Sequence, residues 1–162
     1  MVPGKPRWQA FSPNLGSYPC LRRPRERTIE GMNGVLIFDG YCGVCTRVAN
    51  GLLRLSRTGR LRIEPMQQPG TSERLGIPTE RLLESSWWLD SSGAVFSGAE
   101  GMNAALSAAL GTRLPLWLYR VPGIGALQEI VYRWFAAHRY RFRGVTPLCE
   151  STPERCSAPQ AS

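Results

Sequence analysis

Apolar residues near position 40 change from a strand-like run to a helix-like spacing. Residues 35–38 are four consecutive apolar residues between Gly34 and Asp39, a pattern typical of a buried parallel strand. Residues 42–56 then carry apolar side chains at helical spacing. Residues 61–66 alternate between apolar and polar and predict a second strand. This order predicts a β-α-β unit with a right-handed crossover.

The next third of the chain predicts a short helix over residues 78–83 and then a hairpin. Residues 87–89 and 94–96 read as its strands, joined by a four-residue turn, Asp90 to Gly93.

Two further helices are predicted after the hairpin. Ser97 and Glu100 have the spacing of a capping box, and the helix they open is expected to end at Gly111. A stretch interrupted by prolines follows. The last helix has an apolar face that consists of Leu127, Ile130, Val131, Trp134, Phe135 and His138.

The order of elements matches the thioredoxin-like plan, so we expect an α/β fold. It has a central mixed sheet of about four strands flanked by helices, with an extra C-terminal helix. We divide the chain into a disordered basic leader (residues 1–31), the thioredoxin-like domain (32–149) and a flexible tail (150–162). In such sheets the active site lies beyond the carboxyl ends of the parallel strands.

Composition narrows the class of protein. The 162 residues suffice for one domain, and the formal charge is +8. Residues 1–30 hold six basic and two acidic residues, so half of the excess lies in the leader. We therefore expect no nucleic-acid partner.

No apolar run approaches the roughly 20 residues of a membrane span, and we expect a cytoplasmic monomer. Translation from Met32 and organelle import through the leader are two hypotheses for residues 1–31.

Cysteine usage indicates the chemistry. Of five cysteines, only Cys42 and Cys45 have a motif spacing, and residues 1–30 show no apolar core of a secretion signal. A reducing compartment fits this better than a secreted disulfide scaffold, and there a Cys-x-x-Cys pair is more often catalytic or metal-binding than structural.

The position of this pair favours thiol–disulfide exchange without a metal or organic cofactor. Cys42 falls at the start of the predicted helix, where unpaired N–H groups and the helix dipole lower the pKa of a thiol. We therefore take Cys42 as the nucleophile, and Cys45, expected to be less exposed, as the resolving thiol. Asp39 either moves a proton during exchange or simply forms the Asp-Gly turn; a carboxylate there would raise the thiol pKa. Tyr41 is expected either to flank the site as an apolar lid or to be an ordinary packing side chain.

Rival interpretations involve residues far from this pair. A zinc site would also need Cys20, Cys149, Cys156 or His138, whose spacing is poor. A histidine at the end of an apolar helical face, such as His138, more often hydrogen-bonds the helix-end carbonyls than binds a metal. The alternating residues 139–143 could bind phosphate, a membrane surface or a protein, but such a run more often caps a helix. The alternative function is thus a binding module with a structural or zinc-bound Cys pair and a basic C-terminal helix that docks a partner.

The segment Asp39-Gly40-Tyr41-Cys42-Gly43-Val44-Cys45 resembles the D-G-x-C-x-x-C opening of the DCC family of predicted thiol–disulfide oxidoreductases. The similarity continues through residues 35–149, including a segment from Trp134 to Gly144 that is followed by Cys149.

The resemblance implies a thioredoxin-like fold and protein-disulfide reductase activity, with Asp39, Cys42 and Cys45 at the motif positions. From the proposed chemistry we expect a thiol or disulfide substrate and a reductase or glutathione as electron source. The resemblance also suggests Cys149 as an additional redox thiol. Two departures from thioredoxins stand out. Glu84-Ser85-Ser86 replaces the cis-proline before the third strand, and no Trp precedes Cys42, which puts the mode of substrate docking in doubt.

Overall fold

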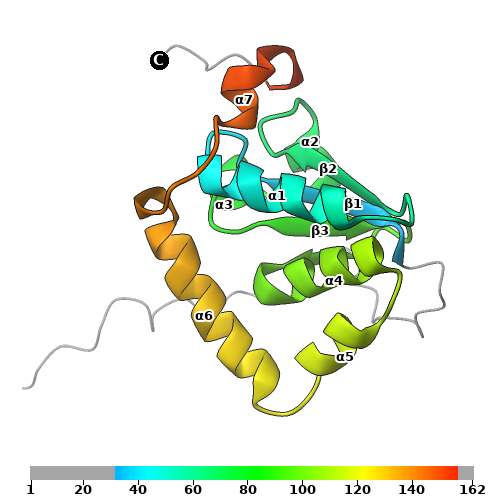
Figure 1. Ribbon diagram of the computed structural model, residues 1–162. Coiled ribbons are helices and arrows are strands. Elements are labelled where there is room, and N and C mark those ends of the chain that lie inside the picture. Colours follow the sequence, from blue (N-terminus) through cyan, green and yellow to red (C-terminus); the bar gives the residue numbers. More distant parts are fainter. Residues whose placement is uncertain (1–31, 157–162) are drawn as a thin grey trace, which may run out of the picture.

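Four strands form one mixed sheet with helices on both faces, in a computed structural model that describes residues 32–156 (Figure 1). The strands are β1 (Gly34–Phe38), β2 (Leu61–Pro65), β3 (Trp87–Asp90) and β4 (Val95–Ser97). The helices are α1 (Gly43–Leu55), α2 (Thr71–Leu75), α3 (Thr79–Leu82), α4 (Gly98–Leu110), α5 (Leu114–Tyr119), α6 (Ile124–His138) and α7 (Leu148–Ser151), with 3-10 turns η3 (Arg139–Arg141) and η4 (Pro153–Arg155).

The sheet has the order β2-β1-β3-β4. β1 pairs in parallel with β2 and antiparallel with β3, and β3 and β4 form the hairpin. The predicted β-α-β unit and hairpin are therefore confirmed. This arrangement is consistent with the thioredoxin-like plan.

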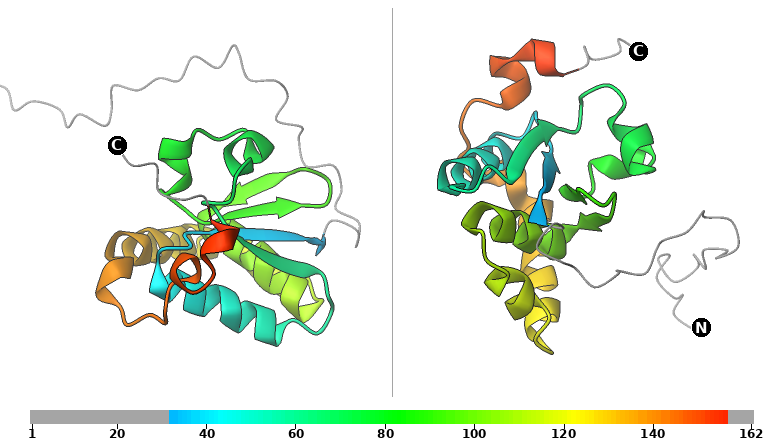
Figure 2. Two further views of the ribbon diagram at one scale, coloured as in Figure 1. Left: turned by 90° about the horizontal axis from the view of Figure 1, so that it is seen from above. Right: turned by 90° about the vertical axis from the view of Figure 1, so that its right-hand side faces the viewer.

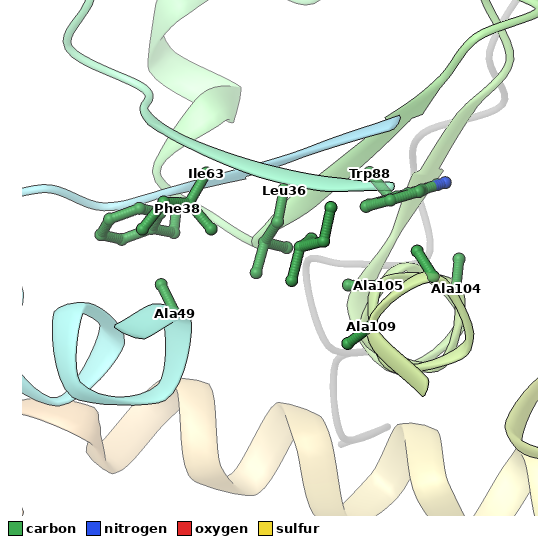
Figure 3. Close-up of a cluster of buried hydrophobic side chains, with 10 residues drawn as sticks. Leu36, Phe38, Ala49, Ile63, Trp88, Ala104, Ala105 and Ala109 are labelled. Atoms are coloured by element: carbon green, nitrogen blue, oxygen red, sulfur yellow. The ribbon is translucent and has the colours of Figure 1, made fainter. Parts of the chain in front are cut away.

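β1 is the central strand and is buried on both faces. Leu36 and Phe38 face α1 and α4, whereas Val35 and Ile37 face the side of α2 and α3. The α4 helix packs closely on the sheet because small side chains line its inner face (Figure 3): Ala104, Ala105, Ala108 and Ala109. Trp88 fills the space between these alanines and the sheet, with 1% of its surface exposed.

Two local features differ from the sequence-based expectation. The α5 helix lies in the stretch that the prolines were expected to interrupt, because Pro115 occupies its first turn, where a missing N–H costs nothing. Ser97 precedes α4 but its side chain makes no capping hydrogen bond. The Glu100 N–H instead donates to Glu129 of α6, at 3.3 Å, so the capping box is wrong.

The α6 helix differs most from expectation. It spans the predicted residues, but none of its residues is buried. Beyond it, residues 150–156 continue as the end of α7 and as η4, where a flexible tail was expected. The leader (1–31), Cys20 and residues 157–162 lie outside the described residues, and the division into leader, domain and tail stays a prediction. No helix between residues 32 and 156 is long and apolar enough to cross a bilayer.

Candidate active site

The Cys pair lies where β1 ends and α1 begins. Cys42 is the N-cap residue of α1, and its Sγ accepts a hydrogen bond from the Cys45 N–H at 3.2 Å. The first turn of α1 contains no acidic residue. The sulfur therefore lies at the positive end of the helix, as the sequence predicts, and no carboxylate of that turn opposes the dipole.

Cys42 and Cys45 are joined as a disulfide, with their Cα atoms 5.2 Å apart. Their exposure is the reverse of the expectation. Only 1% of Cys42 is exposed, whereas Cys45 is partly exposed. Tyr41, which was expected to lie over the site or to pack, is 43% exposed. Something other than Tyr41 must therefore cover Cys42.

Residues 142–149, which we call the C-terminal strap, cover Cys42. The Val145 N–H donates to the Gly43 carbonyl at 3.1 Å, and the Cys149 N–H donates to the Gly40 carbonyl at the same distance. A third bond, from the Leu148 N–H to Thr46 Oγ1, is 3.2 Å long. The strap is thus attached on both sides of Cys42.

Two glycines make this close contact possible. A Cβ on Gly43 would overlap the carbonyl oxygen of Val145, and a Cβ on Gly144 would overlap the backbone of Gly43 and Val44. Both glycines are visible in the sequence, but nothing in it pairs two positions about 100 residues apart.

Asp39 is the centre of a buried polar network. Its Oδ1 accepts from the Tyr41 N–H at 3.1 Å and from Gln67 Nε2 at 2.9 Å. Its Oδ2 accepts from the Tyr140 hydroxyl at 2.9 Å and lies 3.4 Å from Arg139 Nη2. The Tyr41 contact is the turn-forming role that the sequence suggested. The others connect the end of β1 to β2 and to the end of α6.

Arg139 and Tyr140 are the functional residues that sequence reasoning missed. The alternating run that contains them was expected to cap the helix or to bind phosphate, a membrane surface or a protein, but Arg139 turns inward. Its Nη2 also donates to the Leu83 carbonyl at 3.1 Å, and its guanidinium lies 5.0 Å from the centre of the Tyr140 ring. The only signal in the sequence is the run itself, and it does not show where the side chains point.

Cys45 opens onto an apolar cavity of about 130 Å³ between the sheet, α1 and α6. Its polar edge consists of Asp39, Arg139, Ser85 and Ser86, and its apolar wall includes Leu36, Phe38, Val48, Met102 and Phe135.

Ser85 and Ser86 line the same cavity as Cys45 and come directly before β3, where thioredoxins have a cis-proline. The described backbone has no cis peptide bond. The Ser86 N–H donates to the Tyr132 hydroxyl at 2.8 Å and is thus already occupied within the protein. In this structure that N–H is therefore not free to pair with the backbone of a substrate, and the mode of substrate docking stays a prediction.

Cys149, Cys156 and His138, the residues considered for a zinc site that the structure describes, make other contacts. Cys149 is disulfide-bonded to Cys156, with 5.6 Å between their Cα atoms. His138 places Nδ1 2.7 Å from the Trp134 carbonyl, which is the helix-end role expected for it. No three His, Cys, Asp or Glu side chains come together as metal ligands in residues 32–156.

A comparison with protein families gives one match over most of this structure. The model described as DCC1-like thiol-disulfide oxidoreductase matches residues 36–145, which include the Cys pair, Asp39, Arg139 and Tyr140. Neither the curated proteins nor the solved structures give a significant match.

Proposed function

Because the chain belongs to the DCC1-like thiol-disulfide oxidoreductase family, which indicates a thiol–disulfide redox role, we propose that it is a protein-disulfide reductase that cycles Cys42 and Cys45 between dithiol and disulfide. Cys42 is the nucleophile and Cys45 is the resolving thiol. The observation that carries this assignment is the hydrogen bond from the Cys45 N–H to Cys42 Sγ at the start of α1. A thiolate gains from that donor and from the helix dipole, so charge is favoured on Cys42 rather than on Cys45.

The reaction proceeds in two exchange steps. The Cys42 thiolate attacks one sulfur of a substrate disulfide, which forms a mixed disulfide and releases the other substrate sulfur as a thiolate. The Cys45 thiolate then attacks Cys42 Sγ, which releases the second substrate sulfur and closes the Cys42–Cys45 disulfide. Two electrons pass to the substrate, and the two protons of the dithiol end on the released thiols. Two equivalents of glutathione, or a dithiol reductase, restore the reduced enzyme and are themselves oxidised to a disulfide.

Access to Cys42 requires the C-terminal strap to move. In the disulfide form the strap lies over Cys42, where three hydrogen bonds hold it to Gly40, Gly43 and Thr46. In the dithiol form the strap has to separate from the start of α1 before a protein disulfide can reach the sulfur. Cys45, in contrast, faces the apolar cavity and stays out of the path of the incoming disulfide.

Asp39 has two roles in this proposal. Its network fixes the turn that carries Cys42, and its carboxylate accepts the proton from the Cys45 thiol when that thiol attacks. The support for the second role is that Asp39 and Cys45 line the same cavity. The protonated carboxylate, held by Arg139 and Tyr140, then gives this proton to the substrate thiolate that leaves in the second step.

The test is the redox state of each cysteine across a graded glutathione buffer, measured by thiol alkylation and mass spectrometry. We expect a reversible two-electron transition of the Cys42–Cys45 pair. The double variant Cys149→Ser, Cys156→Ser serves as a control, because it removes the second disulfide from the measurement. A pair that resists both oxidation and alkylation until a chelator is added would be metal-bound and would refute the redox cycle.

The roles of the two cysteines are tested by turnover of a protein disulfide with dithiothreitol as the electron source. Cys42→Ser should abolish reduction of the substrate. Cys45→Ser, reduced beforehand and then freed of dithiothreitol, should accumulate mixed disulfides between Cys42 and the substrate, because no second thiol is present to resolve them. Normal turnover by Cys45→Ser would show that the two roles are assigned incorrectly.

A further inference from the structure

The outer face of α6 is apolar and exposed. Leu127, Ile130, Val131 and Trp134 follow one another at helical spacing, and 56–65% of each residue is exposed. The opposite face of α6 carries its contacts with the rest of the protein: Gln128 bonds Asn103, and Tyr132 bonds Ser86. The apolar stripe is therefore not the surface by which α6 packs on the protein.

α5 continues this surface. Leu114, Trp117 and Leu118 lie at the same helical spacing and are 41–63% exposed. The Tyr119 hydroxyl of α5 donates to Glu129 of α6 at 3.0 Å. Burial, and then this bond to Glu129, raise the pKa of Tyr119 to about 12, so the donor stays protonated over the physiological range. The α5–α6 hairpin projects from the end of the molecule opposite to α7 (Figures 1 and 2).

The charge around this surface has one sign. Residues 112–145 contain six arginines and a single acidic residue, Glu129, which faces inward to α4 and α5. Four of the arginines are exposed and form no ion pair within residues 32–156: Arg120, Arg133, Arg141 and Arg143. An occupant of the apolar stripe would thus be surrounded by uncompensated positive charge.

This charge decides between the candidate occupants. A second copy of the chain would pair the surface with itself across a two-fold axis and bring like charges together. The leader would also bring like charges together, because residues 1–30 hold six basic and two acidic residues. An anionic bilayer instead neutralises the arginines and accepts the apolar side chains below its headgroups. Tryptophans such as Trp117 and Trp134 prefer that depth.

We propose that the α5–α6 hairpin, through Leu127, Ile130, Trp134 and the exposed face of α5, docks the protein on an anionic phospholipid surface. This inference does not depend on the redox cycle. α6 then has one face on the lipid, while Phe135 on its other side lines the cavity next to Cys45. Docking in this way holds the redox site beside the bilayer.

The experiment is co-sedimentation of the full chain with vesicles of phosphatidylcholine alone or mixed with phosphatidylglycerol. We expect binding to the mixed vesicles only, and weaker binding as salt is added. The double variant Leu127→Gln, Ile130→Gln should partition roughly tenfold or more weakly, because two apolar side chains no longer enter the lipid. Leu55→Gln is the matched control: Leu55 is 45% exposed on α1, and its replacement should leave binding unchanged.

A charge pair separates this face from general attraction of a basic protein. Arg120→Gln with Arg133→Gln should weaken binding several-fold, and Arg57→Gln, an exposed arginine after α1, should have a much smaller effect. Circular dichroism and disulfide reduction should be normal in all variants.

Three results would overturn the proposal. The first is no binding to either vesicle, and the second is binding that survives the Leu127→Gln, Ile130→Gln change, which would place the lipid contact elsewhere in the chain. The third is a dimer, seen by light scattering, that the same variant dissociates, because the face would then join two copies.

Discussion

β1 and α6 are both strongly apolar in sequence, yet they have opposite fates in the structure. All four apolar residues of β1 are at most 4% exposed, whereas the apolar stripe of α6 lies in solvent. β1 is held by hydrophobic packing on both faces of the sheet. α6 and the strap are held at separate points by polar contacts, such as Tyr132 with Ser86 and Arg139 with Asp39. Apolar periodicity therefore identifies residues that share a face, but not what that face contacts.

The comparison is tested most directly by shortening one apolar side chain in the core of the sheet, where Trp88 of β3 packs with β1, and one on α6. Trp88→Ala should lower the free energy of unfolding by about 3–5 kcal/mol, because it leaves a cavity between the sheet and α4. Ile130→Ala should change it by no more than about 0.5 kcal/mol, because Ile130 is 65% exposed. Urea unfolding measures both values. A large loss for Ile130→Ala would mean that the stripe is covered in the free protein.

The next largest loss of stability is expected at the contact between Arg139 and Asp39. Breaking this contact tests the polar attachment of the C-terminal region. Arg139→Met leaves the buried carboxylate of Asp39 without its cation, and we expect a loss of about 2–4 kcal/mol. Gln67 and Tyr140 still donate to Asp39, which keeps the loss below that of Trp88→Ala.

A double-mutant cycle with Asp39→Asn checks this explanation. If the cost comes from an uncompensated charge, the double variant should recover part of the stability lost in Arg139→Met. Strictly additive losses would show that the two side chains act separately.

Local patterns in the sequence predict most of the fold and half of the site. The buried run of β1, the alternation of β2 and the turn at Asp90 each act over a few residues. Their signals survive because the turn is self-contained: Asp90 Oδ1 accepts from the N–H groups of Ser92 and Ala94, both at 2.8 Å. The position of Cys42 at a helix start is local in the same way.

The remaining half of the site depends on contacts between distant residues. Asp39 and Tyr140 are 101 positions apart, and no periodicity links them. The burial of Cys42 is equally non-local, because it results from a strap that begins 100 residues later. The direction of the α6 stripe could not be predicted either, since a helix with two usable faces packs by the one that finds partners. Here Gln128 pairs with Asn103 and Tyr132 with Ser86.

After Trp88→Ala and Arg139→Met, the smallest of the three expected losses of stability concerns the strap, where one added methyl group tests whether close backbone contact covers Cys42. Gly144→Ala places a Cβ against the backbone of Gly43 and Val44, which cannot move aside as a side chain would. We expect a loss of about 1–2 kcal/mol, within the usual range for overpacking. In the reduced protein, Cys42 should also be alkylated several-fold faster.

Gly51→Ala is the matched control, because Gly51 has nothing within 4 Å of the added Cβ. Alanine favours helix α1 there by about 0.5–1 kcal/mol and should leave the reactivity of Cys42 unchanged. Equal alkylation rates in the two variants would mean that the strap does not limit access to the sulfur.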